Sequence, residues 1–229
     1  MALTPSNDEA FLREVDDELR REQMTTMWRR YGRIGIAVLV LFLLALAAFL
    51  WWRAEGVRKA EAQAEQLSVA LADIQAGRKA EAEKKFDALA ADGKPGYRAT
   101  ALLTKAALAG DRGDKKATLS LLGTVVADES LPQAYRDLAK IRQTLIDFDD
   151  VQPQVVVERL KPLAVEDSAF FGTAGELTAM AYIKMNRSAE AGRLLATIAK
   201  DKTLPGTLRG RTAQLASMLG TYVDPASFN

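Results

Sequence analysis

The sequence contains no cysteine and no histidine among its 229 residues. Disulfide bonds, thiolate chemistry, haem ligation by histidine, the usual zinc sites and a serine–histidine–aspartate triad are therefore excluded. The lack of cysteine does not identify the compartment, because it suits oxidising and reducing surroundings alike. Carboxylate chemistry remains open, but a chance pairing among 30 acidic residues carries little information. We expect no enzymatic activity, no cofactor, no metal and no small-molecule substrate.

An excess of one charge is lacking too. The chain has 31 basic and 30 acidic residues and a net charge of +1, and the two signs are interspersed. A protein that binds nucleic acid would present a basic face. We therefore expect no nucleic-acid partner.

The sequence does contain one long apolar run without charged residues, from Ile34 to Trp52. As a helix the run would be about 28 Å long, close to the ~30 Å of a bilayer's hydrocarbon core. Its Leu, Ile, Val and Phe residues would favour insertion by about 4 to 7 kcal/mol. A buried helix of a soluble core is the alternative, but it needs partners that cover every side, and the rest of the chain offers only amphipathic segments. The run predicts a transmembrane helix, and its expected lipid-facing residues are Ile34, Leu39, Leu43, Leu46, Trp51 and Trp52.

The flanks of this run predict how it is oriented. Aromatic and basic residues of the kind found at membrane interfaces precede it, namely Trp28, Arg29, Arg30, Tyr31 and Arg33. Arginine is more frequent in the twenty residues before the run than basic residues are in the twenty after it, which places the N-terminus in the cytoplasm and the chain after Arg53 across the membrane. A cleaved signal peptide, with Ala54-Glu55-Gly56 as its site, is the alternative. The long segment before the run and the length of the run itself argue against it.

The first 33 residues predict a helical arm. Phe11, Val15 and Leu19 recur every four residues and would share one helix face, while the opposite face is charged. This apolar stripe suits a docking helix for a cytoplasmic partner. A helix resting on the membrane surface is equally compatible, although its acidic excess is unlike the basic polar faces of such helices.

After the membrane the chain repeats itself. Three turn residues, each followed fifteen residues later by Asp and then by Pro, mark copies of one pattern: Gly77, Gly113 and Asn186. Their spacings fit one period near 36 residues, with a missing copy expected to turn near Asp150 and to be interrupted by Pro162. This period predicts an all-α, degenerate tetratricopeptide-like solenoid of helical hairpins. An unrelated helical bundle with chance punctuation is the alternative.

The pattern also predicts individual elements and contacts. We expect Gly or Asn in a left-handed cap at the turns, and Ala82 and Ala191 where two helices of a hairpin cross closely. First helices would form the concave wall, with Tyr97, Tyr135, Phe170 and Tyr182 as exposed candidates for partner binding, although aromatics at helical spacing more often pack inward. The expected helices are 57–76, 79–91, 96–109, 114–127, 132–148, 153–161, 168–185, 188–200 and 206–220.

The arm segment from Phe11 to Glu22, the segment from Trp28 to Gly32, the single apolar anchor and the closing segment from Leu204 to Leu219 together resemble the YfgM-like family of tetratricopeptide-like proteins of the bacterial inner membrane, and most closely its alphaproteobacterial members. The first-helix Trp and the Leu-Gly pair of well-formed repeats are absent. The resemblance implies an ancillary subunit of the Sec translocon, whose periplasmic domain contacts clients or chaperones. A structural or assembly subunit of another inner-membrane complex is the alternative. The expected division is a cytoplasmic arm over 1–33, a transmembrane helix over 34–52 and a periplasmic domain over 53–229.

Overall fold

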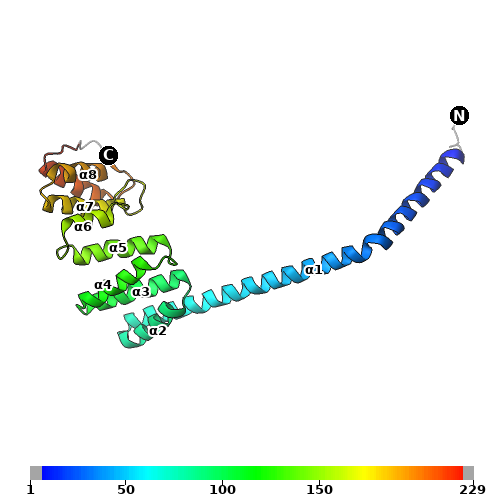
Figure 1. The fold of residues 1–229 in the computed structure, drawn as a ribbon, viewed down its shortest axis with the longest axis horizontal. Helices are drawn as coiled ribbons and strands as arrows, with labels where there is room; N and C mark the ends of the chain where they lie inside the picture. The colour runs from blue at the N-terminus through cyan, green and yellow to red at the C-terminus, as the bar shows by residue number, and fades with distance from the viewer. Residues whose placement is uncertain (1–6, 224–229) are drawn as a thin grey trace. The chain divides into compact units, whose positions relative to one another are not determined.

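The computed structural model describes the backbone of residues 7–223 and the side chains of residues 28–30 and 32–223, and the described backbone is helical throughout apart from its turns (Figure 1). The chain divides into two compact units, residues 1–60 and 61–229. The helices are α1 (Asn7–Gln75), α2 (Lys79–Asp92), α3 (Pro95–Asp111), α4 (Lys115–Ala127), α5 (Gln133–Asp147), α6 (Pro153–Leu160), α7 (Phe171–Lys184), α8 (Ser188–Lys200) and α9 (Gly206–Met218).

The predicted fold class is confirmed, and the predicted ends of α2 to α9 lie within three residues of the observed ones. The largest difference is at α7, which begins at Phe171 and not at 168. Ser168 explains this difference, because its hydroxyl accepts the N–H of Phe170 and its carbonyl accepts the N–H of Phe171. These two bonds close a turn where the helix was expected. At the other end of the chain, the segment predicted as 57–76 is the last part of the continuous helix α1.

The described residues of the first unit, 7–60, all belong to α1. Among the described residues, α1 is the helix long and apolar enough to cross a membrane, with a mean hydropathy of 2.9 over its most apolar window and none of that window buried. The large apolar side chains of the run are exposed along its whole length, and Trp52 is the most exposed of them at 71%. A helix that is apolar on every side and covered by nothing within its own unit matches the composition of a membrane span.

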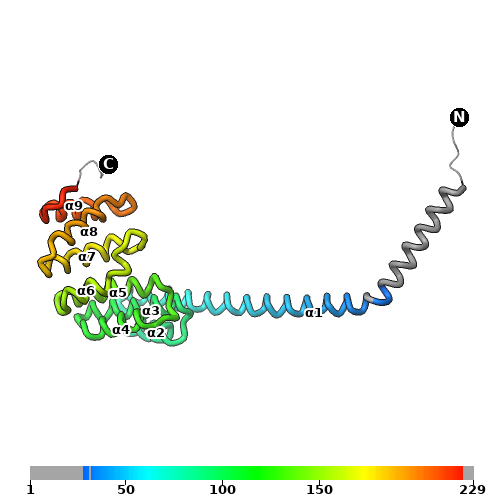
Figure 2. Tube along the Cα trace, turned by 45° about the horizontal axis from the view of Figure 1, so that its top comes forward, coloured from blue at the N-terminus to red at the C-terminus, as the bar shows by residue number. Residues whose placement is uncertain are grey.

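In the second unit, each helix packs against the next along the chain, and the two views agree on this order of stacking (Figures 1 and 2). We call the end of α1 together with α3, α5, α7 and α9 the first helices, and α2, α4, α6 and α8 the second helices. A first helix and the second helix that follows it form one hairpin. The unit is therefore a solenoid of helical hairpins.

The predicted left-handed caps are present at three turns, with φ of 78° at Gly77, 76° at Gly113 and 58° at Asn186. In each, the N–H after the cap residue donates to the carbonyl five residues back, the bond that defines a Schellman motif. Gly220, at φ 80°, ends α9 in the same way through the N–H of Thr221 and the carbonyl of Ala216. Because Gly220 follows Asn186 by about one repeat period, α9 takes the place of the first helix of a fifth repeat.

The turn predicted near Asp150 is built differently. The burial pattern on either side of the turn places Val151, one residue later, in register with the three cap residues. The described residues between α5 and α6 have no positive φ, which a β-branched residue such as Val151 avoids. The N–H of Val151 instead donates to the carbonyl of Asp147, four residues back, at 3.1 Å. The turn therefore lies where it was predicted, near Asp150, and Val151 occupies the place of the cap residue.

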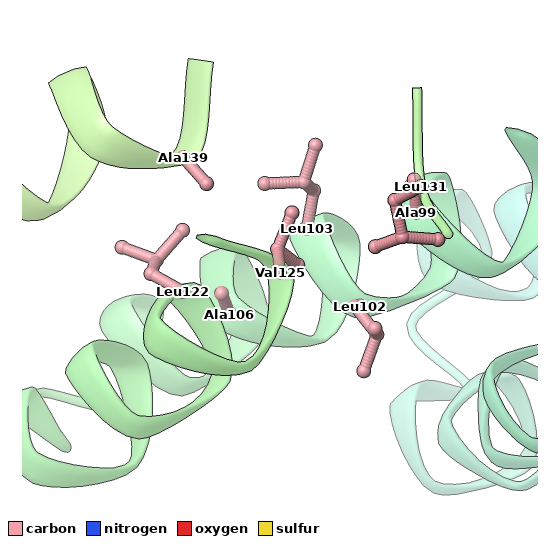
Figure 3. Close-up of a cluster of buried hydrophobic side chains, with 8 residues drawn as sticks. All are labelled: Ala99, Leu102, Leu103, Ala106, Leu122, Val125, Leu131 and Ala139. Carbon is pink, nitrogen blue, oxygen red and sulfur yellow. The ribbon is translucent and has the colours of Figure 1, made fainter. Parts of the chain in front are cut away.

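One register fills the core of every hairpin. The residue five positions after each turn residue is small or β-branched, and it is buried. The residues nine and twelve positions after each turn residue are larger apolar residues, and they are buried too. In the order of the four hairpins these are Ala82, Phe86 and Leu89, then Thr118, Leu122 and Val125, then Val156, Leu160 and Leu163, then Ala191, Leu195 and Ile198, and Leu163 lies just after the end of α6. Figure 3 shows one such cluster, in which Leu122 and Val125 of α4 lie close to Leu103 and Ala106 of α3. The predicted burial of Ala82 and Ala191 is confirmed.

Candidate interaction surface

The same register exposes one position on each first helix, and this position is apolar in the end of α1, α3, α5 and α7. Seven residues before each turn residue lies a buried small side chain, such as Ala106 of α3. The next residue is rotated by about 100° around the helix and faces outward. In the first four repeats this outward residue is apolar and exposed, and we call these four residues the apolar row: Leu71, Ala107, Leu145 and Met180. In α9 the equivalent residue is Gln214, so the row does not continue into α9.

A groove of about 330 Å³ lies along this row between α3, α4 and α5. Its apolar lining includes Leu103, Leu122 and Leu145. Leu145 is 55% exposed, although the two other leucines are buried in the core. The groove therefore offers apolar surface to a side chain that enters from solvent.

Two charged residues, Arg142 of α5 and Asp111 of α3, line the same groove. Within the described part of the chain neither side chain has an ion-pair or hydrogen-bond partner. By contrast, Lys105 of α3 lies 2.5 Å from Oδ1 of Asp87. A guanidinium without a partner beside apolar surface can bind a carboxylate with two parallel hydrogen bonds. The groove thus combines an apolar floor with one available cation, Arg142, and one available anion, Asp111.

Two buried acidic residues of the first helices form contacts that stabilise the fold. Asp73 and Asp147 each stand four residues before a turn residue, and both are buried. A hydrogen bond from Lys85, the larger cause, and another from Arg78 hold the pKa of Asp73 below its ordinary value. Because the partners of Asp73 lie in the turn and in α2, this cluster joins a first helix to its second helix and leaves no charge free for binding.

The four aromatic candidates for partner binding are half-buried. Tyr97, Tyr135 and Phe170 stand sixteen residues before successive turn residues, and each is half-buried against a core cluster. Tyr182 is half-buried as well, between two clusters, and the guanidinium carbon of Arg187 lies 4.6 Å from its ring centre. Partial burial of these four rings agrees with the expectation that aromatics at helical spacing more often pack inward, because the adjoining hairpins cover one side of each. Partner binding by them stays a prediction.

Neither the apolar row nor Arg142 was among the residues predicted from the sequence to bind a partner. The signal was available, because the cap residues Gly77, Gly113 and Asn186 set a register from which the outward positions follow. The predicted candidates were aromatic residues, which are recognised by type, whereas exposure depends on position within the repeat.

The predicted membrane residues are exposed wherever their side chains are described. This holds for the basic and aromatic residues before the run, and also for the apolar residues within it. They are Trp28, Arg29, Arg30, Arg33, Ile34, Leu39, Leu43, Leu46, Trp51 and Trp52. The side chains of Phe11, Val15, Leu19 and Tyr31 lie outside the described residues.

Within the described residues, no group of three or more acidic side chains gathers in a way that could hold a metal ion. The features that remain are a stack of helical hairpins and one continuous face with an apolar row. Such an array presents an extended binding surface, and the class that these features define is a helical-repeat scaffold for protein–protein interaction.

Comparison with known families identifies the family of this helical-repeat scaffold. The family model of the tetratricopeptide repeat-like domain matches residues 26–196, about three quarters of the chain. The chain belongs to this family, whose members are protein-interaction modules with protein partners. No curated protein and no solved structure matches the chain.

Proposed function

We propose that the protein is a membrane-anchored module that binds other proteins through its first-helix face and acts by binding alone. Helix α1 crosses a bacterial inner membrane once over residues 34–52, residues 1–33 stay in the cytoplasm, and residues 53–229 lie in the periplasm. The uncovered apolar run of α1 and the arginines before it support this arrangement.

The apolar row is the observation that carries the binding proposal. Single exposed apolar residues are ordinary on a protein surface, but here one recurs at the same place in four successive repeats. The groove at Leu145 adds depth, and Arg142 adds a charge without a partner. The occupant that fits is a polypeptide segment with a large apolar side chain and a nearby carboxylate.

The resemblance of the arm and of the closing segment to YfgM-like proteins supports a particular setting for this module. In that setting the protein is an ancillary subunit of the Sec translocon, and its repeats receive periplasmic clients or chaperones. The proposed polypeptide groove is compatible with this role, because emerging clients expose apolar segments.

Co-purification from membranes in mild detergent tests the proposal. The full chain should retain Sec components, and Leu145→Asp should reduce the capture of the proteins that bind the repeats. Val155→Asp is the matched control, because Val155 is 42% exposed on the second helix α6, away from the apolar row. Recovery of a different fixed complex would replace the Sec assignment. Equal capture by both variants would place the binding surface elsewhere.

Protease protection in spheroplasts tests the orientation. External protease should digest the chain after Arg53 and spare the arm. Cleavage confined to the arm would reverse the proposed orientation. Extraction of the chain by alkaline carbonate would show that α1 is not inserted at all.

A further inference from the structure

The part of α1 just before the apolar run has a hollow that is lined by two arginines and two apolar side chains. Its volume is about 400 Å³, and its lining residues are Trp28, Arg29, Gly32, Arg33 and Ile36. These positions lie on one side of the helix, since they are spaced by about one turn. The hollow therefore brings two guanidinium groups together at one end of the proposed membrane span.

Gly32 makes the hollow possible. A Cβ built at Gly32 would lie 3.4 Å from Cδ2 of Trp28, so a larger side chain there would fill the space beside the indole ring. By contrast, a Cβ at Gly35 meets nothing within 4 Å. Gly35 does not line the hollow, and it provides a matched site for comparison.

The charged residues on the two sides of the apolar run differ in whether they form ion pairs. After the run, Glu55 binds Arg58 at 2.8 Å and Lys59 at 3.8 Å. Before it, neither Arg29 nor Arg33 has an ion-pair partner among the described residues. The sequence from Gln23 to Ala54 contains no Asp or Glu. The two arginines therefore have no acidic side chain within a helical turn to balance them.

We propose that this hollow binds the headgroup of an anionic phospholipid, with its phosphate between Arg29 and Arg33 and its acyl chain along Ile36. The inference rests on the proposed membrane insertion of α1, which places these residues at the headgroup level. Arginine suits the ligand because its planar fork of donors matches phosphate oxygens. Trp28 suits the position because its ring is apolar and its N–H is a donor, as in interfacial aromatic belts. The anions present at that depth are lipid phosphates.

The test uses the full chain in mild detergent, titrated with phosphatidylglycerol or phosphatidylcholine and followed by native mass spectrometry. We expect phosphatidylglycerol to be retained in preference to phosphatidylcholine. Arg29→Gln with Arg33→Gln should weaken its retention by roughly 10- to 30-fold, since each arginine contributes electrostatic attraction near an anionic surface. Arg58→Gln with Lys59→Gln removes the same number of charges from the other side of the run and should leave retention unchanged.

A second pair of variants separates a built site from diffuse attraction. Gly32→Leu keeps every charge but fills the hollow, and it should weaken phosphatidylglycerol retention, whereas Gly35→Leu should not. Equal retention in these two variants, or equal retention of the two lipids, would overturn the proposal. Displacement of the lipid by millimolar inorganic phosphate would also overturn it, because the site would then be an anion site open to water.

Vesicle flotation distinguishes this failure from failure of the proposed function. Full chain reconstituted with phosphatidylcholine alone should still float with the vesicles if α1 inserts. A chain that floats but shows no lipid preference overturns only the headgroup site. A chain that does not float overturns the membrane anchor and the headgroup site together.

Discussion

Nη1 of Arg159 lies 2.8 Å from Oδ1 and 3.0 Å from Oδ2 of Asp147, and this ion pair joins α6 to the end of α5. Both side chains are largely withdrawn from water, at 19% and 9% exposure. The same guanidinium nitrogen also donates to the hydroxyl of Thr144, which is fully buried, at 3.2 Å. Since α6 is the shortest helix of the described array, this cluster compensates for its small packing surface.

Arg159→Met should destabilise the repeat unit by about 3 to 5 kcal/mol, because it leaves the carboxylate of Asp147 buried without a partner. Lys184→Met is the matched control. The ammonium of Lys184 lies 2.5 Å from Oδ1 of Asp149, but the Asp149 side chain is 87% exposed. Exposed pairs contribute about 0 to 1 kcal/mol. Urea unfolding followed by far-ultraviolet circular dichroism measures both, and equal losses would contradict the assigned burial.

The fragment from Glu55 to Asn229 should fold without the membrane segment. Its core clusters are formed within the second unit, and α9 covers the last hairpin. We expect a soluble, strongly helical fragment that unfolds cooperatively. A circular-dichroism spectrum with strand content, or unfolding without a cooperative transition, would show that the array depends on the rest of the chain.

The helices and most turns were predictable because their signals are local. Gly77, Gly113 and Asn186 adopt the left-handed conformation that these residue types reach at low cost. Pro95 and Pro153 stand at the start of α3 and α6, where a missing N–H is harmless. Each of these choices is decided within a few residues of sequence.

The features that were missed depend on packing between hairpins. Val151 carries no turn signal of its own, and its place follows only from the burial of Val156 and Leu160 after it. Tyr97 and Leu145 are both large residues on first helices, yet the neighbouring hairpin covers one and not the other. Residue type alone cannot decide this, because exposure depends on the repeat register.

Ala191→Leu should destabilise the fragment, since Ala191 is fully buried where α8 meets its neighbours. Overpacking of this kind costs about 1 to 3 kcal/mol. Ala189→Leu is the same substitution two residues earlier, at an exposed position of the same helix. It should change stability by less than about 0.5 kcal/mol. Denaturant unfolding of the two variants compares them directly, and a larger loss for Ala189→Leu would refute the repeat register.

Gly113→Ala should destabilise the fragment by about 1 to 2 kcal/mol, because its φ of 76° strains any residue with a Cβ. No neighbouring atom would meet that Cβ, so the cost is conformational and not steric. Gly123→Ala lies inside α4, where a Cβ also meets nothing within 4 Å, and it should stabilise by about 0.5 to 1 kcal/mol. Thermal and urea unfolding should therefore give opposite signs for two identical substitutions. The same sign for both would show that the cap conformation is not required.

The stability of the fragment should fall as the pH is lowered below about 5, in part through two equivalent loops. Asp128 and Asp201 each begin the sequence Asp-x-Ser/Thr-Leu-Pro, which links a second helix to the next first helix. The hydroxyl of Ser130 lowers the pKa of Asp128 below its ordinary value near 3.8. The hydroxyl of Thr203, which donates to Oδ1 at 2.7 Å, does the same for the pKa of Asp201.

Because these carboxyl pKa values are lower in the folded chain than in the unfolded one, the unfolded state binds more protons at acidic pH. The stabilisation is complete above the unfolded pKa and is lost as the pH falls through the folded pKa. Ser130→Ala with Thr203→Ala removes the hydroxyl donors but keeps both carboxylates. This variant should be less stable near neutral pH and should lose less stability between about pH 5 and pH 3. Urea unfolding across that range measures the slope, and a slope equal to that of the unmodified fragment would show that the two hydroxyls do not set these pKa values.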